Sequence, residues 1–132
     1  MILVDSSGWI ELFTDGPLVQ SFEPFLADEA QVITPTIVLY EVYRLIRRER
    51  SEEEALTAVA AMKRTRLVPL SETIALTAAD LGLEHRLAMA DSIVYATARV
   101  ERAELVTSDE DFAHLPAVTY FAKKTGPKGR AR

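Results

Sequence analysis

The sequence predicts a three-layer α/β/α fold with a mostly parallel central sheet. Short apolar runs that are typical of buried strands alternate with helical patterns of ten or more residues. Such an alternation requires crossover connections between parallel strands. The chain has 132 residues, of which 48% are hydrophobic, so it can build one compact core but not two ordinary domains. We therefore expect one domain over residues 1–122 and a basic, disordered tail without an apolar pattern over residues 123–132.

The first third of the chain predicts two strands with two helices between them. Residues 2–4 form an apolar run of buried-strand type, and Asp5 directly after it is a good N-cap for a helix that continues to about Phe13. Residues 32–33 predict the second strand. The intervening helix has an apolar face made of Leu18, Phe22, Phe25 and Leu26.

Two longer helices follow. Pro35, preceded by Thr34, has the sequence context of a first helical residue, and the apolar pattern continues to Ile46. Ser51 and Glu54 form a capping box for the next helix. The predicted apolar face of that helix consists of Leu56, Val59 and Met62.

The second half repeats the alternation of strands and helices. A strand over 67–70 contains Pro69, which favours an edge position or a strand end. A helix over 71–82 is expected to end at its glycine, and another helix begins at Asp91. The last two strands are predicted over 104–107 and 118–121.

Composition excludes several classes of site and location. The absence of cysteine rules out disulfides, thiolate zinc sites and cysteine nucleophiles, so oxygen ligands remain for any metal. There is no apolar run of about 18 residues and no signal-peptide pattern after Met1, so we expect a cytoplasmic protein that does not associate with membranes.

Four acids are candidates for one shared site. Asp5 and Asp109 directly follow predicted strands, which is where parallel sheets place their working residues, while Asp91 begins a helix that a crossover can bring to the same edge. Alone, Asp5 and Asp91 are explained as N-caps, Asp109 as a turn residue, and Glu41 as an acid that is partly exposed or paired with Arg44. Together they favour a bound divalent cation, because clustered carboxylates raise one another's pKa unless a cation neutralises them. Oxygen ligands favour Mg²⁺, with Mn²⁺ able to replace it.

The motifs around these acids carry a family resemblance. They are Val4-Asp5-Ser6-Ser7 with Trp9-Ile10, Tyr40-Glu41-Val42, Ala90-Asp91-Ser92-Ile93 with Ala96-Thr97-Ala98, and Leu105-Val106-Thr107-Ser108-Asp109-Glu110-Asp111-Phe112. In this order they resemble the PIN domain over about residues 1–121, and they look most similar to the VapC-type toxins of bacterial and archaeal toxin-antitoxin pairs. One departure is Ala88, where many relatives have a small hydroxyl residue; it affects only secondary hydrogen bonding.

The resemblance implies a magnesium-dependent endoribonuclease that inhibits translation, forms a homodimer and is neutralised by a cognate antitoxin. It makes Asp5, Glu41, Asp91 and Asp109 the metal-binding acids. Of these four catalytic residues, we assign Asp5, Asp91 and Asp109 to metal contact and Glu41 to a role as a ligand or a water-orienting group. Thr107 would be a supporting polar residue and Asp111 a supporting acid.

The sequence leaves several alternative functions to be considered. A housekeeping PIN-type ribonuclease, or an inactive PIN module that binds RNA or protein, would have a similar sequence, although the presence of all four acids argues against inactivity. Aspartyl-phosphate phosphatases place a second acid two residues after the nucleophile, where this chain has Ser7. Receiver domains need paired acids after the first strand and a lysine near the last, and neither is well placed here.

The basic residues are distributed unevenly. The net charge is -5, and residues 1–43 contain no lysine or arginine, whereas four arginines follow Glu41 closely. Helical spacing predicts Arg44 and Arg48 on the face of Glu41, with Arg47 and Arg50 elsewhere around the helix. We therefore expect Arg44 and Arg48 to contact RNA, the alternative being an ordinary solvated helix face. For the basic tail over residues 123–132, the alternative to disorder is an arm that contacts RNA.

Overall fold

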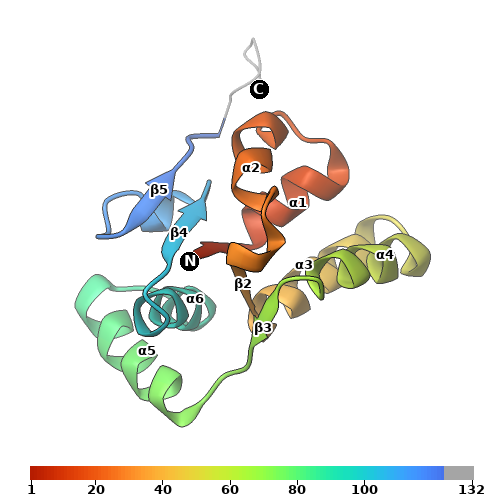
Figure 1. Ribbon diagram of the computed structural model, residues 1–132. Helices are drawn as coiled ribbons and strands as arrows, with labels where there is room; N and C mark the ends of the chain where they lie inside the picture. The colour runs from red at the N-terminus through yellow and green to blue at the C-terminus, as the bar shows by residue number, and fades with distance from the viewer. Residues whose placement is uncertain (124–132) are drawn as a thin grey trace.

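The computed structural model describes residues 1–123 and contains a five-stranded, parallel sheet in the order β3-β2-β1-β4-β5. The strands are β1 (Ile2–Val4), β2 (Val32–Pro35), β3 (Arg66–Val68), β4 (Glu104–Thr107) and β5 (Val118–Tyr120). The α-helices are α1 (Ser6–Thr14), α2 (Val19–Leu26), α3 (Thr36–Glu49), α4 (Glu52–Met62), α5 (Glu72–His85) and α6 (Met89–Val100), with short 3-10 helices η1 (Glu29–Gln31) and η2 (Glu110–Phe112). Helices cover both faces of the sheet, which confirms the three-layer α/β/α prediction (Figure 1). The tail was predicted over residues 123–132, and all of it apart from residue 123 lies outside the described residues.

The order of the strands determines where a site can form. The chain runs from the central β1 outward to β2 and β3, then crosses the sheet and continues through β4 to β5. Leu3 is paired with Ile33 of β2 on one side and with Leu105 of β4 on the other. The direction of winding therefore reverses between β1 and β4. In open parallel sheets, ligands bind beyond the carboxyl ends of the strands at such a reversal.

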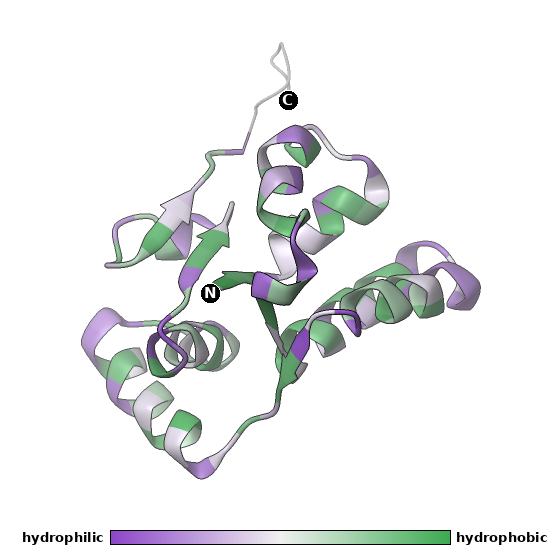
Figure 2. Ribbon diagram, in the orientation of Figure 1, coloured by the Kyte–Doolittle hydropathy of each residue, from purple (hydrophilic) through white to green (hydrophobic). Residues whose placement is uncertain are grey.

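The core lies around the three central strands. Leu3, Val4, Ile33, Leu105 and Val106 have no exposed surface. Figure 2 shows that β1 and β2 are hydrophobic while the turn between α3 and α4 is hydrophilic. Strands that are covered on both faces are expected to be apolar along their whole length, which explains why these short runs were recognisable in the sequence.

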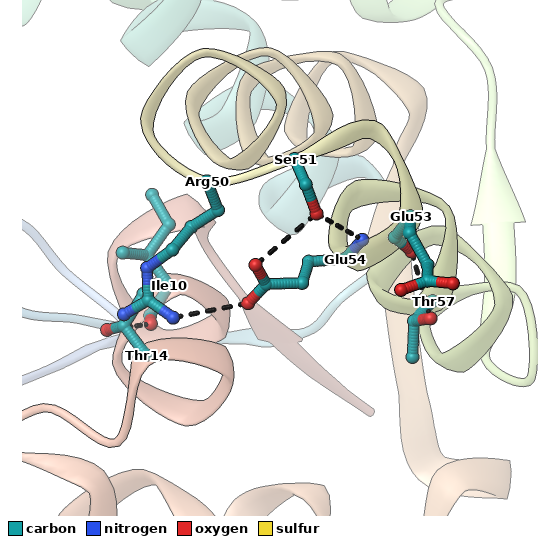
Figure 3. A network of polar contacts seen from close by, with 7 residues as sticks. All are labelled: Ile10, Thr14, Arg50, Ser51, Glu53, Glu54 and Thr57. Carbon is teal, nitrogen blue, oxygen red and sulfur yellow. Dashed lines mark hydrogen bonds and ion pairs between the residues drawn. The ribbon is translucent and has the colours of Figure 1, made fainter.

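The helices pack as three consecutive pairs, and the α3–α4 pair shows how a predicted cap forms (Figure 1). The Ser51 hydroxyl accepts a hydrogen bond of 3.0 Å from the Glu54 N–H, and the Glu54 carboxylate pairs with Arg50 at 3.2 Å (Figure 3). The predicted apolar face of α4 was wrong for Leu56, which is 53% exposed. Ala55 and Ala58 are buried instead, on the side of α4 that packs against α3. The distance between two packed helices depends on the size of the side chains at their contact, and small alanine side chains allow α4 to lie close to α3.

Three predicted helix boundaries differ from the structure. Pro35 is the last residue of β2 and the N-cap of α3, so it is not a helical residue. Helix α5 continues past Gly82, where a Cβ atom would lie 2.5 Å from the Ser92 hydroxyl oxygen of α6. This glycine thus permits a close approach of two helices and does not end one. Helix α6 begins at Met89, so Asp91 lies in its first turn and is not a cap.

Within residues 1–123, no helix combines the length and the apolar character that crossing a membrane requires.

Candidate metal centre

Asp5 lies where β1 leaves the sheet, and its side chain is almost completely buried. Its N–H donates to the Val106 carbonyl oxygen at 3.2 Å, which extends the β1–β4 pairing by one residue. Its Oδ1 also accepts from the Ser7 N–H at 3.2 Å as the N-cap of α1. The capping explanation for Asp5 is therefore correct, but it leaves the second carboxylate oxygen for other contacts.

Two hydroxyl groups hold both oxygens of this carboxylate. The Ser7 hydroxyl donates to Oδ1 of Asp5, and the Thr107 hydroxyl donates to Oδ2 at 2.8 Å. The same hydroxyl oxygens accept backbone N–H groups, Ser7 from Ser108 at 3.0 Å and Thr107 from Asp109 at 2.9 Å. Asp5 and the segment after β4 are thus positioned by one network. Thr107 was predicted as a supporting residue, whereas Ser7 was given no role, although it belongs to the motif Val4-Asp5-Ser6-Ser7.

The remaining acids converge on this network. Carboxylate oxygens of Asp91, Asp109 and Asp111 lie within 4.8 Å of one another. Asp109 also accepts from the Asp111 N–H at 3.0 Å, so the turn explanation for Asp109 is correct as well. Asp5, Glu41, Asp91 and Asp109 line one cleft of about 340 Å³. The structure therefore brings the four predicted acids together and places Asp111, expected only in support, among the closest three.

Burial and mutual repulsion raise the pKa of the acids in this cleft. Burial is the largest cause for Asp91, whose pKa rises to about 7 with further contributions from the charges of Asp109 and Asp111. Burial also raises the pKa of Asp5 to about 6, although its hydroxyl partners oppose the shift. The pKa of Glu41 is raised by burial and by the charge of Asp109. At neutral pH these acids therefore favour a ligand that stabilises their charged forms.

The donor set fits a hard divalent cation. Every candidate ligand is a carboxylate oxygen, and such ligands favour Mg²⁺ or Mn²⁺ over softer metals. The residues that line the cleft include no histidine, so neither His85 nor His114 lies there as a general acid or base. The geometry thus supports carboxylate-held metal and gives no support to histidine chemistry.

The arginines of α3 lie on an adjoining surface. Tyr40, Tyr43, Arg44, Arg47 and Arg48 line one hollow on the outer side of this helix. Arg47, expected elsewhere around the helix, lines the same hollow as Arg44 and Arg48, whereas Glu41 lines the acidic cleft and not this hollow.

Arg50, in contrast, points away from that hollow. Its guanidinium group lies beside Glu54 in the turn between α3 and α4 (Figure 3). The separation of Arg50 from Arg44 and Arg48 is thus present in the structure.

Comparison with known proteins gives this geometry a family. The PIN domain family model matches residues 2–118. A chain of a toxin-antitoxin complex from Klebsiella pneumoniae is 27% identical, with a TM-score of 0.78 over 93% of this chain and 100% of that chain. VapC20 from Mycobacterium tuberculosis, described as a Sarcin-Ricin loop cleaving toxin, is 19% identical, with a TM-score of 0.73 over 88% of this chain and 95% of that chain.

A third structure, VapBC2 from Rickettsia felis bound to a DNA fragment from their promoter, is 17% identical, with a TM-score of 0.72 over 92% of this chain and 98% of that chain. At such low identity, VapC20 and VapBC2 support the fold alone. No curated protein matches the chain significantly. The family model covers nearly the whole of the described domain and agrees with the parallel sheet and the acidic cleft. The chain therefore belongs to the PIN domain family.

Proposed function

We propose that this protein is a divalent-metal-dependent endoribonuclease and the toxin of a type II toxin-antitoxin pair. One observation carries the proposal: Asp5, Glu41, Asp91 and Asp109, which are far apart in the sequence, line one cleft at the carboxyl edge of the sheet. The raised pKa values of three of these acids support a site that is completed by a cation. Membership in the PIN domain family supports phosphodiester hydrolysis as the reaction.

Each acid has a proposed role. Asp5, Asp91 and Asp109 would hold Mg²⁺ or Mn²⁺, and Glu41 would be a further ligand or would orient the attacking water. Asp111 is close enough to Asp91 and Asp109 to contribute as well. When bound, the cation supplies an activated water and offsets the charge that develops on the phosphate.

The hydroxyl groups have a positioning role in this proposal. Ser7 and Thr107 hold both carboxylate oxygens of Asp5, which fixes the direction in which this ligand presents its charge. Hydrogen-bonded partners of this kind orient the ligands of metal sites and tune their affinity. Ser7 and Thr107 are thus expected to affect activity without touching the substrate.

The proposed partners are RNA, a cognate antitoxin and a second copy of the chain. The similarity to a toxin-antitoxin complex supports an antitoxin. Leu76 and Leu83 share one face of α5 and are 63% and 84% exposed, and Met89 at the start of α6 is 77% exposed. Large exposed apolar side chains of this kind favour a contact with another protein. We assign the surface formed by Leu76, Leu83 and Met89 to the contact between two copies of the chain in a homodimer. The cytoplasmic location stays a prediction.

The activity is tested by incubating the purified protein with total RNA in Mg²⁺ or in EDTA, with Asp5→Asn alongside. We expect the wild-type protein to cleave RNA in Mg²⁺ but not in EDTA, because carboxylates alone cannot offset the negative charge of the phosphate. Cleavage that is equally fast in EDTA would contradict the metal-dependent mechanism.

The toxin role needs a separate test. Expression of the wild-type chain alone should slow growth, and co-expression of a short open reading frame encoded beside it should restore growth. Asp5→Asn is the control for the burden of expression. Normal growth with abundant, folded, uninhibited wild-type protein would favour a housekeeping ribonuclease.

A further inference from the structure

A lysine from the end of the described chain lies at the acidic cleft. Lys123 lines this cleft together with Asp5, Glu41, Asp91 and Asp109, and it lines an adjoining hollow of about 370 Å³ beside Asp111. The residues that line these two hollows include seven acids, and Lys123 is the only lysine or arginine among them. Three of these acids, Asp5, Glu41 and Asp91, have a raised pKa, with burial as the largest cause. The ammonium group of Lys123 is therefore surrounded by acidic residues and has no other lysine or arginine beside it in these two hollows.

The fold determines the position of Lys123. Strand β5 runs parallel to β4 with Tyr120 opposite Thr107, so its carboxyl end reaches the edge where Asp5 and Asp109 lie. The Phe121 N–H donates to the Thr107 carbonyl oxygen at 2.8 Å, which extends this pairing by one residue. The chain is thus attached to the strand next to the site until two residues before Lys123.

Aromatic packing holds the same segment from the other side. The ring of Phe121 packs edge-on against Phe22 of α2 with 5.4 Å between ring centroids, and it lies 6.0 Å from Phe25. After β5 the chain accordingly runs toward α2 (Figure 1). Since an edge-to-face contact of two aromatic rings is favourable, the point from which Lys123 extends is defined by packing.

No ion pair uses the charge of Lys123. Among residues 1–123, none of the pairs within 4.0 Å between a basic and an acidic group includes this ammonium group. Lysine carries a compact charge on a flexible stem with three donors, which suits contact with a phosphate. Seven acids would repel an RNA strand, whereas a cation at the rim offsets that repulsion.

We propose that Lys123 contacts a backbone phosphate of the RNA bound in the cleft, next to the phosphate that is cleaved. This inference rests on the proposed ribonuclease function and adds a substrate-binding residue to it. The competing explanation is that Lys123 only offsets the charge of the acids in the metal-free protein. The two explanations differ in how salt affects the reaction.

The test measures RNA cleavage in Mg²⁺ at KCl concentrations from about 50 to about 200 mM for the wild type, Lys123→Ala and Lys123→Arg. Lys123→Ala should raise KM roughly three- to tenfold at low salt, with little change in kcat, because it removes a contact that the bound substrate already makes. The slope of log(kcat/KM) against log[KCl] should become shallower by about 0.7, the value for one phosphate contact on a single strand. Lys123→Arg should retain most of the wild-type KM and slope.

The matched control is Lys63→Ala. Lys63 is also exposed, but it follows α4 and precedes β3, at the opposite edge of the sheet, so its removal should change neither KM nor the slope. Thermal melting establishes that all variants are folded. If Lys123→Ala matches the wild type in KM and slope, or if kcat alone falls while the slope stays the same, the phosphate contact is overturned. If the wild type does not cleave RNA in Mg²⁺, the proposed function itself fails, and that result is distinct from either of these.

Discussion

The two edges of the sheet carry their charges in opposite ways. At the amino edge, Arg66 at the start of β3 pairs with Glu101 at the end of α6 at 2.7 Å, and both side chains reach solvent. At the carboxyl edge, Asp5, Asp91 and Asp109 line one cleft, and Asp5 is 4% exposed. One edge therefore holds paired, hydrated charges, and the other holds like charges that are partly removed from water.

This difference shows which edge is built for a ligand. Exposed ion pairs contribute about 0–1 kcal/mol and need no further explanation. A buried carboxyl group whose pKa rises from 3.8 to about 6 destabilises the folded chain by roughly 3 kcal/mol at neutral pH. At neutral pH, a bound cation would offset this destabilisation. The carboxyl edge is thus the part of the molecule whose stability should depend on metal.

The largest expected difference between the two edges is in activity. Asp91→Asn should lower the rate of RNA cleavage in Mg²⁺ at least about 10³-fold while the protein stays folded, because the change keeps the shape of the side chain and removes a ligand charge. Glu101→Gln makes the same chemical change at the amino edge and should cleave like the wild type. Single-turnover cleavage measures both variants. Comparable activity of Asp91→Asn and Glu101→Gln would remove the distinction between the edges.

A smaller effect is expected from the hydroxyl that holds Asp5. Thr107→Val keeps the size of the side chain but removes the donor to Asp5 and the acceptor for the Asp109 N–H. We expect about a 10- to 100-fold loss of metal affinity, read from the Mg²⁺ concentration that gives half-maximal cleavage. The control is Thr119→Val on β5, whose hydroxyl donates to Glu104 at 2.9 Å. An unchanged Mg²⁺ requirement for Thr107→Val would mean that this hydroxyl has only a structural role.

Removing one acid should stabilise the metal-free protein. Asp5→Asn is expected to melt at a higher temperature than the wild type in EDTA at neutral pH, since asparagine still caps α1 and its neutral amide avoids the cost of burying a charged carboxylate and lessens the repulsion in the cleft. Magnesium should reverse this order. A ligand at about a hundredfold above its Kd stabilises the wild type by about 2.7 kcal/mol, and the variant with a damaged site gains less. If Mg²⁺ raises both melting temperatures equally, Asp5 is a helix cap and not a metal ligand.

The same acids predict how stability depends on pH without metal. In the unfolded chain Asp5 and Asp91 ionise near pH 3.8, but in the folded chain they remain protonated until about pH 6 and about pH 7. The folded state therefore binds more protons over this interval, and the free energy of unfolding falls as the pH rises through it. Melting curves in EDTA should show the highest melting temperature in mild acid and a decrease toward pH 7.

The control for this pH dependence comes again from the amino edge. Glu101→Gln should keep the wild-type decrease, whereas Asp5→Asn should flatten it, because only the second change removes a carboxyl group with a raised pKa. Saturating Mg²⁺ should also flatten the wild-type profile. A wild-type melting temperature in EDTA that rises steadily from about pH 4 to pH 7 would contradict the raised pKa values of these buried acids.

The sequence predicted the fold better than the details of its helices. Apolar runs are recognisable because strands covered on both faces must be hydrophobic, and the strand Glu104–Thr107 was found with its bounds. The end of α5 was predicted at Gly82, but the glycine serves the contact with Ser92. The buried face of α4 was likewise displaced from Leu56 to neighbouring alanines. These features depend on partners that are distant in the chain, so local patterns did not determine them.

For the site, the sequence predicted four acids that line the cleft but not all of the residues that position them. Asp5 and Asp109 could be found because each follows a strand, and parallel strands bring such residues to one edge. Ser7 was missed because its partner, the Ser108 N–H, is 101 residues away. The proximity of Asp111 to Asp91 depends on the turn at η2, which the sequence showed only as a polar segment. The residues that hold the ligands are therefore harder to predict than the ligands themselves.

The smallest expected effect concerns the arginines of α3, which extend the comparison from the acids to the cations. Arg50 pairs with Glu54 at 3.2 Å, and Arg48 pairs with Glu49 at 3.0 Å, whereas Arg44 has no acidic group within 4.0 Å among residues 1–123. A cation that is already paired must give up its partner to bind a phosphate.

We therefore expect Arg44→Ala to weaken RNA binding roughly two- to fivefold at low salt, Arg48→Ala less, and Arg50→Ala least. Fluorescence anisotropy with a labelled single-stranded RNA, in an Asp91→Asn background that prevents cleavage, measures all three. The differences should shrink as KCl rises, because phosphate contacts act by releasing counterions. Equal binding by the three variants and their parent at low salt would show that the arginine surface of α3 is a solvated helix face and that RNA approaches the acids from another side.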